Sequence, residues 1–165
     1  MIEFLQWIEV QPPSAFIRES ASIWGYAMFL FAHVVGMTML AGGATVISFA
    51  LLGLWPKGAA VKPLEKLFPI MWVGFGLMLF TGVGLFMADA TIRAMNWDFW
   101  IKMVFVAGGV MLTSRVRKNV FADPTLDSAV PDGARRLAWA WLFCWFCAVI
   151  AGRLIAYVGP VAGFF

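Results

Sequence analysis

The sequence predicts an all-α integral membrane protein in which four helices cross the bilayer as a bundle. Hydrophobic residues make up 62% of the chain and charged residues 13%, whereas a soluble domain is about half apolar and about a quarter charged. The apolar residues gather in four long runs, each close to the roughly 20 residues that a transmembrane helix needs. With 165 residues, we expect this bundle and no separate soluble domain.

We place the four spans at about residues 23–54, 68–88, 97–113 and 137–158, within a transmembrane domain over residues 23–165. The first run is longer than a bilayer requires, so its helix must tilt, protrude or loosen near Gly42 and Gly43. Lys102 lies near one end of the third span, from where its long stem can reach the interface. Asp98 precedes Lys102 by four residues, a spacing that predicts an ion pair along the helix.

Residues 1–22 form a separate short segment before the first span. Its apolar residues alternate with Glu3 and Glu9 as in a short amphipathic helix, which Pro12 ends. Ser14 is then expected to cap a further turn. We interpret the segment as an amphipathic helix in the outer interface of the membrane, and the alternative is a disordered tail. The acidic start argues against a cleaved signal peptide, which needs basic residues there.

The basic residues predict the orientation of the bundle. Eight of the twelve Lys and Arg residues lie in the first and third connections between spans, which share one side of a four-span protein. The positive-inside rule puts that side in the cytoplasm and both termini in the periplasm, as in a bacterial inner-membrane protein. Nucleic acid is not an expected partner, because the net charge of +3 is small and divided among loops. The eight are Lys57, Lys62, Lys66, Arg115, Arg117, Lys118, Arg135 and Arg136.

His33 is the only histidine of the chain, and it lies within the first predicted span. It is ten residues past Ile23, which puts it about 15 Å deep and close to mid-membrane. A titratable ring at this depth indicates a functional site. His33 could ligate haem or chlorophyll, relay protons, or form an interhelical hydrogen bond, which is ordinary in bundles. Gly36, one turn later, either opens a slot for a flat macrocycle or allows close helix packing, and both uses predict glycine.

Arg153 is a second polar residue inside a span, and we expect its depth to differ from that of His33 by about 9 Å. That offset is comparable with the distance from a haem iron to its propionates, so Arg153 and Lys102 are candidate propionate partners. An ion pair with a nearby carboxylate, or contact with lipid phosphates, explains Arg153 as well. One histidine leaves the second axial position to Met78, which also lies near mid-membrane, to a second copy of the chain, to another subunit, or to nothing.

Other chemistries find little support in the sequence. Cys144 and Cys147 have a C-x-x-C spacing but lie within a span, and we interpret them as small apolar residues. The sequence has no P-loop, no Gly-x-Ser-x-Gly motif and no Ser/His/Asp arrangement. Acidic residues avoid the spans, which argues against a carboxylate-based ion path. We therefore expect no catalytic activity of the chain itself.

Four stretches of sequence carry a family resemblance. They are F-A-H-V-V-G at residues 31–36, T-G-V-G-L-F at 81–86, N-W-D-F-W-I-K at 96–102 and A-G-R-L-I-A-Y at 151–157. In this order they resemble an uncharacterised family of bacterial membrane proteins with four transmembrane helices. Members often have Asp-Leu-Arg where this chain has Ser48, Phe49 and Ala50. The family implies the fold and no particular activity.

That family is distantly similar to small membrane cytochromes of the b561 or copper-resistance-D kind, which hold haem b by helix-borne histidines but have more histidines than this chain. Our preferred hypothesis is therefore electron transfer through a haem b ligated by His33, with Arg153 and Lys102 near its propionates. The alternative is a non-catalytic accessory subunit of a larger respiratory or photosynthetic complex, in which His33 only forms a hydrogen bond. Pigment binding by His33 is a third hypothesis. All three predict contact with lipid and with other membrane subunits or a second copy of the chain.

Overall fold

The computed structural model describes residues 2–20, 22–56, 59–124, 126–127 and 130–155, and every regular element among them is helical. Two short helices come first, and the first long helix follows with a π-helical turn in its middle. The elements are α1 (Ile2–Glu9), α2 (Pro12–Glu19), α3 (Tyr26–Met37), the π-turn η1 (Thr38–Gly42), α4 (Gly43–Leu51), the 3-10 turn η2 (Lys62–Lys66), α5 (Leu67–Ala88), α6 (Ala90–Met95), α7 (Trp97–Asn119) and α8 (Asp132–Leu154).

Four helices of the described chain are long and apolar enough to cross a membrane: Tyr26–Leu51, Lys62–Ala88, Trp97–Asn119 and Asp132–Leu154. Many large apolar side chains lie on their outer faces, as expected of helices that face lipid rather than water. The prediction of a multi-pass membrane protein with four helical spans is thereby confirmed.

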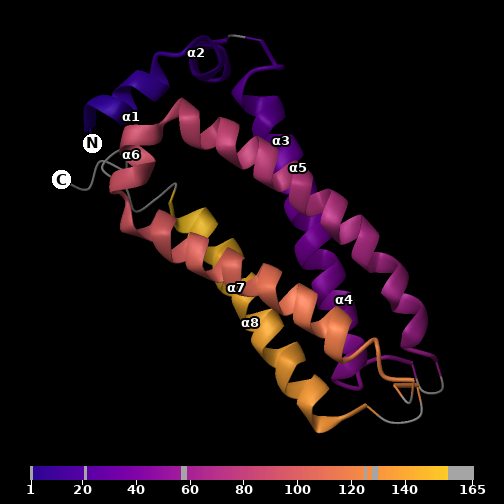
Figure 1. The fold of residues 1–165 in the computed structure, drawn as a ribbon. Helices are drawn as coiled ribbons and strands as arrows, with labels where there is room; N and C mark the ends of the chain where they lie inside the picture. Colours follow the sequence, from indigo (N-terminus) through magenta and orange to yellow (C-terminus); the bar gives the residue numbers. More distant parts are fainter. Residues whose placement is uncertain (1, 21, 57–58, 125, 128–129, 156–165) are drawn as a thin grey trace.

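The first long helix loosens where the sequence predicted. Thr38–Gly42 forms a π-helical turn between α3 and α4, and such turns interrupt the regular hydrogen-bond ladder of an α-helix. Gly43 follows it against α5, where a Cβ would lie only 2.7 Å from Cγ of Met71. The helix then changes partners, because α3 and η1 pack on α5 whereas α4 packs mainly on α8 (Figure 1).

The third and fourth helices begin or end away from their predicted bounds. Helix α7 continues past residue 113 to Asn119, because Val116 is fully buried in the core. Helix α8 begins at Asp132 rather than at residue 137 and buries Ala134. At that end, each helix therefore extends past its predicted bound by at least one turn. These extra turns carry charged residues, and hydropathy alone assigns such residues to loops. The predicted end of the fourth span, residues 156–158, lies outside the described residues.

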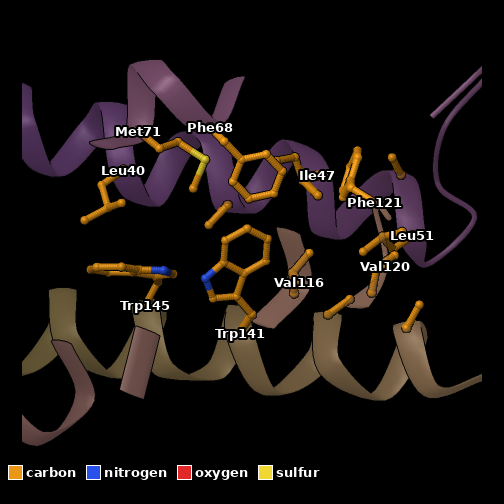
Figure 2. Close-up of a cluster of buried hydrophobic side chains, with 14 of the residues drawn as sticks. Leu40, Ile47, Leu51, Phe68, Met71, Val116, Val120, Phe121, Trp141 and Trp145 are labelled. Carbon is orange, nitrogen blue, oxygen red and sulfur yellow. The ribbon is translucent and has the colours of Figure 1, made fainter. Parts of the chain in front are cut away.

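The main core lies between α4, α5, α7 and α8 (Figure 2). Its centre is aromatic: the ring of Phe68 lies 5.2 Å from that of Phe121 and 6.4 Å from that of Trp141, measured between centroids. Trp141 is fully buried, and its Nε1 donates to the Gly109 carbonyl and to Oγ1 of Thr113, both at 3.1 Å. This polar contact ties α8 to α7.

The two basic connections lie together at one end of the bundle. Oδ1 of Asp127, in the connection after α7, accepts hydrogen bonds from the backbone N–H groups of Val61 and Lys62 at 2.7 and 2.9 Å. The Lys62 ammonium donates to the carbonyl of Phe121. These bonds join the connection before α5 to the connection before α8, so the charges that set the predicted orientation share one side.

The short helices α1 and α2 pack against α5 and α6 at the opposite end (Figure 1). Oε1 of Glu9 accepts a hydrogen bond of 2.6 Å from the backbone N–H of Thr91, at the start of α6. The expected capping role of Ser14 is wrong: Gln11 holds the N-cap position of α2. Ser14 lies inside α2, and its hydroxyl instead donates to the Ile8 carbonyl at 2.7 Å, which joins α2 to α1.

Candidate functional site around His33

His33 lies on α3 and forms a hydrogen bond to α5. Its Nδ1 is 3.1 Å from Oγ1 of Thr81. The Thr81 hydroxyl donates its own proton to the carbonyl of Leu77 at 2.7 Å, so its oxygen is the acceptor in the bond with His33. This pattern assigns the ring proton to Nδ1 and leaves Nε2 with an available lone pair.

The other ring nitrogen of His33 is open. Among the described residues Nε2 forms no hydrogen bond, and the His33 side chain is partly exposed. The neighbouring Cε1 packs on α5, where a Cβ added to Gly82 would lie 3.1 Å away. A histidine whose Nδ1–H is held by an oxygen while Nε2 is open matches the usual arrangement of a metal-ligating histidine.

Gly36 brings the backbones of α3 and α5 together. A Cβ on Gly36 would lie 2.7 Å from the Gly74 carbonyl oxygen and 2.8 Å from the backbone nitrogen of Met78. The sequence left open whether Gly36 makes room for a flat macrocycle or allows close helix packing, and the structure shows close helix packing. At this turn the contact leaves no slot for a flat ligand between α3 and α5. A macrocycle on His33 would have to lie on a different side of the ring.

Met78 lies one turn before Thr81 on the same helix. Its side chain belongs to the buried cluster of the bundle and is 8% exposed. Its backbone carries the contact with Gly36, and its carbonyl lies 3.3 Å from Oγ1 of Thr81, the partner of His33. The structure thus places the predicted second ligand one turn from Thr81 on α5, and it contacts α3 through its backbone.

Lys102 lies on α7 with its side chain across α8. Its Cε and Nζ are 3.4 and 3.6 Å from the position that a Cβ on Gly152 would take. The ammonium group lies within electrostatic range of His33 and of Arg93, a second cation. Arg153 follows Gly152 and is exposed. The structure therefore brings Lys102 near both His33 and the turn of α8 that carries Arg153.

The expected ion pair between Asp98 and Lys102 is wrong, since the side chains form none. Asp98 lies in the first turn of α7, where its backbone N–H bonds to Oδ1 of Asn96 at 2.9 Å, and its side chain is buried with one oxygen unpartnered. Lys102 turns instead toward Gly152. Spacing of four residues puts two side chains on one helix face, but here packing against α8 decides where Lys102 points.

Sequence reasoning missed Thr81, the partner of His33. A threonine inside a span commonly bonds the carbonyl four residues earlier, as Thr81 does, so it attracts no notice alone. Its spacing was the available signal: Gly74, Met78 and Thr81 recur at four and three residues and share one helix face. That face meets α3, and a polar residue on it is a natural partner for a histidine.

The described residues contain no group of three or more His, Cys, Asp or Glu side chains placed to hold a metal ion. No protein-family model, no curated protein and no solved structure matches this chain.

Proposed function

We propose that this chain is a small subunit of the bacterial inner membrane that transfers electrons through haem b, with His33 as an axial ligand. The hydrogen bond from His33 Nδ1 to Thr81 carries the proposal, because it leaves Nε2 unprotonated and open. A bond at the remote nitrogen fixes the ring and makes the ligating nitrogen more basic. The resemblance to small membrane cytochromes supports the same function by analogy.

Each predicted residue has a role in this proposal. Haem supplies a one-electron redox centre when bound. His33 would offer Nε2 to the iron, and Lys102, whose ammonium lies against Gly152, would neutralise a propionate together with Arg153. Gly36 holds α3 against α5 and so fixes the height of the ring. A further ligand to the iron could come from Met78, from the same histidine of a second copy, from another subunit, or from nothing.

The first experiment is an absorption spectrum of the detergent-purified protein from haem-replete cells, oxidised and then reduced with dithionite. The proposal predicts a reduced α-band at the b-type position that disappears in His33→Ala. Phe31→Ala is the matched control, because Phe31 lies on the same helix and is exposed, and it should keep the band. A folded wild-type protein without any haem spectrum would overturn the proposal.

A second candidate function is a non-catalytic accessory subunit of a larger membrane complex. The same hydrogen bond favours it, since Thr81 gives the His33 ring a partner inside the bundle and interhelical bonds of this kind are ordinary. This function predicts a colourless protein that copurifies with other membrane subunits. It also predicts that His33→Ala weakens the fold while causing no spectral change.

In either function we place the basic end in the cytoplasm, both termini in the periplasm, and α1 with α2 in the outer interface, where Phe4 and Trp7 are exposed. Single cysteines in a background without Cys144 and Cys147 test the orientation. In intact cells a membrane-impermeant maleimide should label Glu3→Cys and spare Arg136→Cys. The reverse labelling would contradict the orientation.

A further inference from the structure

An apolar groove of about 490 Å³ runs along the outer surface between the first and fourth long helices. Ala41, Thr45 and Phe49 form one wall, and α8 forms the other with Trp139, Phe143 and Phe146 among its residues. The only hydroxyl among these side chains is satisfied internally, because Oγ1 of Thr45 donates to the Ala41 carbonyl at 2.8 Å. Apart from the indole N–H groups of Trp139 and Trp145, of which the Trp145 group is buried and unpartnered, the groove is lined by groups that suit hydrocarbon.

The length of the groove indicates its occupant. On α8 its lining runs from Trp139 to Val149, which at 1.5 Å per residue is about 15 Å. That is half of the roughly 30 Å hydrocarbon thickness of a bilayer, the depth that one acyl chain of one leaflet fills. The length of this lining therefore matches a single acyl chain.

One end of the groove, at Trp139, lies toward the basic end of the bundle. Arg135 lies four residues before Trp139 and therefore on the same face of α8, and Arg136 follows it. Both guanidinium groups are exposed. Their acidic neighbour is Asp132, whose Oδ1 is 4.0 Å from Nη1 of Arg135 and whose side chain is 92% exposed. Such a distant, exposed ion pair is weak, and guanidinium groups pair well with phosphate.

We infer that this groove binds one acyl chain of an anionic phospholipid, with the headgroup phosphate held by Arg135 and Arg136. The lipid seals the face between α4 and α8. Anionic headgroups gather at basic clusters next to transmembrane helices, and here the cluster and the apolar wall lie in line on one helix. The inference does not depend on whether His33 binds haem.

Native mass spectrometry of the detergent-purified protein tests the site. The protein is incubated with equal amounts of phosphatidylglycerol and phosphatidylcholine and then stripped with excess detergent. We expect one phosphatidylglycerol to remain bound. Ala41→Trp, which fills the groove, should lose it, and Ala107→Trp on the exposed face of α7 should retain it.

The headgroup half of the site has its own variants. Replacing Arg135 and Arg136 by Gln should abolish the preference for phosphatidylglycerol, while Arg115→Gln with Lys118→Gln, exposed residues at the same end, should leave it intact. These surface changes keep the test valid if Ala41→Trp fails to fold. Equal retention of both lipids by the wild type would overturn the inference. So would a wild-type dimer, or a bound protein subunit, that Ala41→Trp abolishes.

Discussion

The imidazole of His33 and the hydroxyl of Thr81, 3.1 Å apart, join the first two membrane-spanning helices by a polar contact within an apolar interface. The contact lies one turn from Gly36, where the two backbones touch. Close packing therefore fixes the distance between the helices, and the hydrogen bond fixes the rotation of the ring. Both proposed functions use this bond. In the electron-transfer function Nε2 of His33 would bind haem iron, whereas in the accessory-subunit function it binds no cofactor.

Thr81→Val should destabilise the protein, because it keeps the shape of the side chain and leaves Nδ1 of His33 without its acceptor. We expect a loss of about 0.6 to 1.7 kcal/mol, the range of interhelical hydrogen bonds measured in membranes. Thermal unfolding in detergent measures it. The control is Thr38→Val, since the exposed Thr38 hydroxyl bonds only the Val34 carbonyl of its own helix. Unchanged stability in Thr81→Val would show that the bond does not hold the helices.

If haem binds, Thr81→Val should also weaken haem affinity by about 10- to 100-fold.

Gly36→Ala should be among the most damaging small changes in the chain. The new methyl group would lie 2.7 Å from the Gly74 carbonyl oxygen, and helix backbones cannot yield locally, so we expect a cost of about 1–3 kcal/mol. Gly76→Ala is the control, because nothing lies within 4 Å of its added Cβ and alanine is the better helix former by about 0.5–1 kcal/mol. Unfolding temperatures of the two variants should move in opposite directions. A tolerated Gly36→Ala would mean that α3 and α5 are further apart than described.

Hydropathy predicted the four spans because long uncharged apolar runs are typical of transmembrane helices. It could not locate the ends of α7 and α8. There Val116 and Ala134 are buried beside charged neighbours, and only the packing of the helices reveals that the charged turns belong to them. The π-turn was one of three predicted outcomes, since an overlong helix with Gly42 and Gly43 must tilt, protrude or loosen.

The sequence predicted which residues belong to the candidate site, but it could not predict which of them contact one another. A lone histidine and an arginine inside spans stand out in any sequence. Their partners do not, because the Thr81 acceptor and the Gly152 surface beneath Lys102 depend on how two helices are rotated against each other. The predicted ion pair between Asp98 and Lys102 is absent for the same reason. The spacing puts both residues on one face of α7, but packing against α8 draws the Lys102 side chain away from Asp98.

Trp141→Phe tests the polar contact between α7 and α8. The change removes the N–H that bonds the Gly109 carbonyl and Thr113 and leaves space in a fully buried site, so we expect a loss of about 2–4 kcal/mol. Trp139→Phe is the control two residues away, because Trp139 is 65% exposed while Trp141 is 0% exposed. Thermal unfolding should separate the two variants clearly. Equal effects would contradict the described core.

Glu9→Ala should loosen the attachment of the N-terminal helices to the rest of the bundle. Oε1 of Glu9 accepts the Thr91 amide at 2.6 Å, at the first turn of α6, and a bond to a charged group contributes about 1.5–3 kcal/mol. Losing it should speed hydrogen exchange of that amide by about 10- to 100-fold, at 1.4 kcal/mol per factor of ten. Glu3→Ala, in the same helix but exposed, should leave the exchange rate unchanged. If Glu9→Ala exchanged as slowly as the wild type, the carboxylate would not be the group that holds α1 on α6. The burial of Leu5 and Ile17 and the bond from Arg18 to the Ala88 carbonyl would then hold the segment.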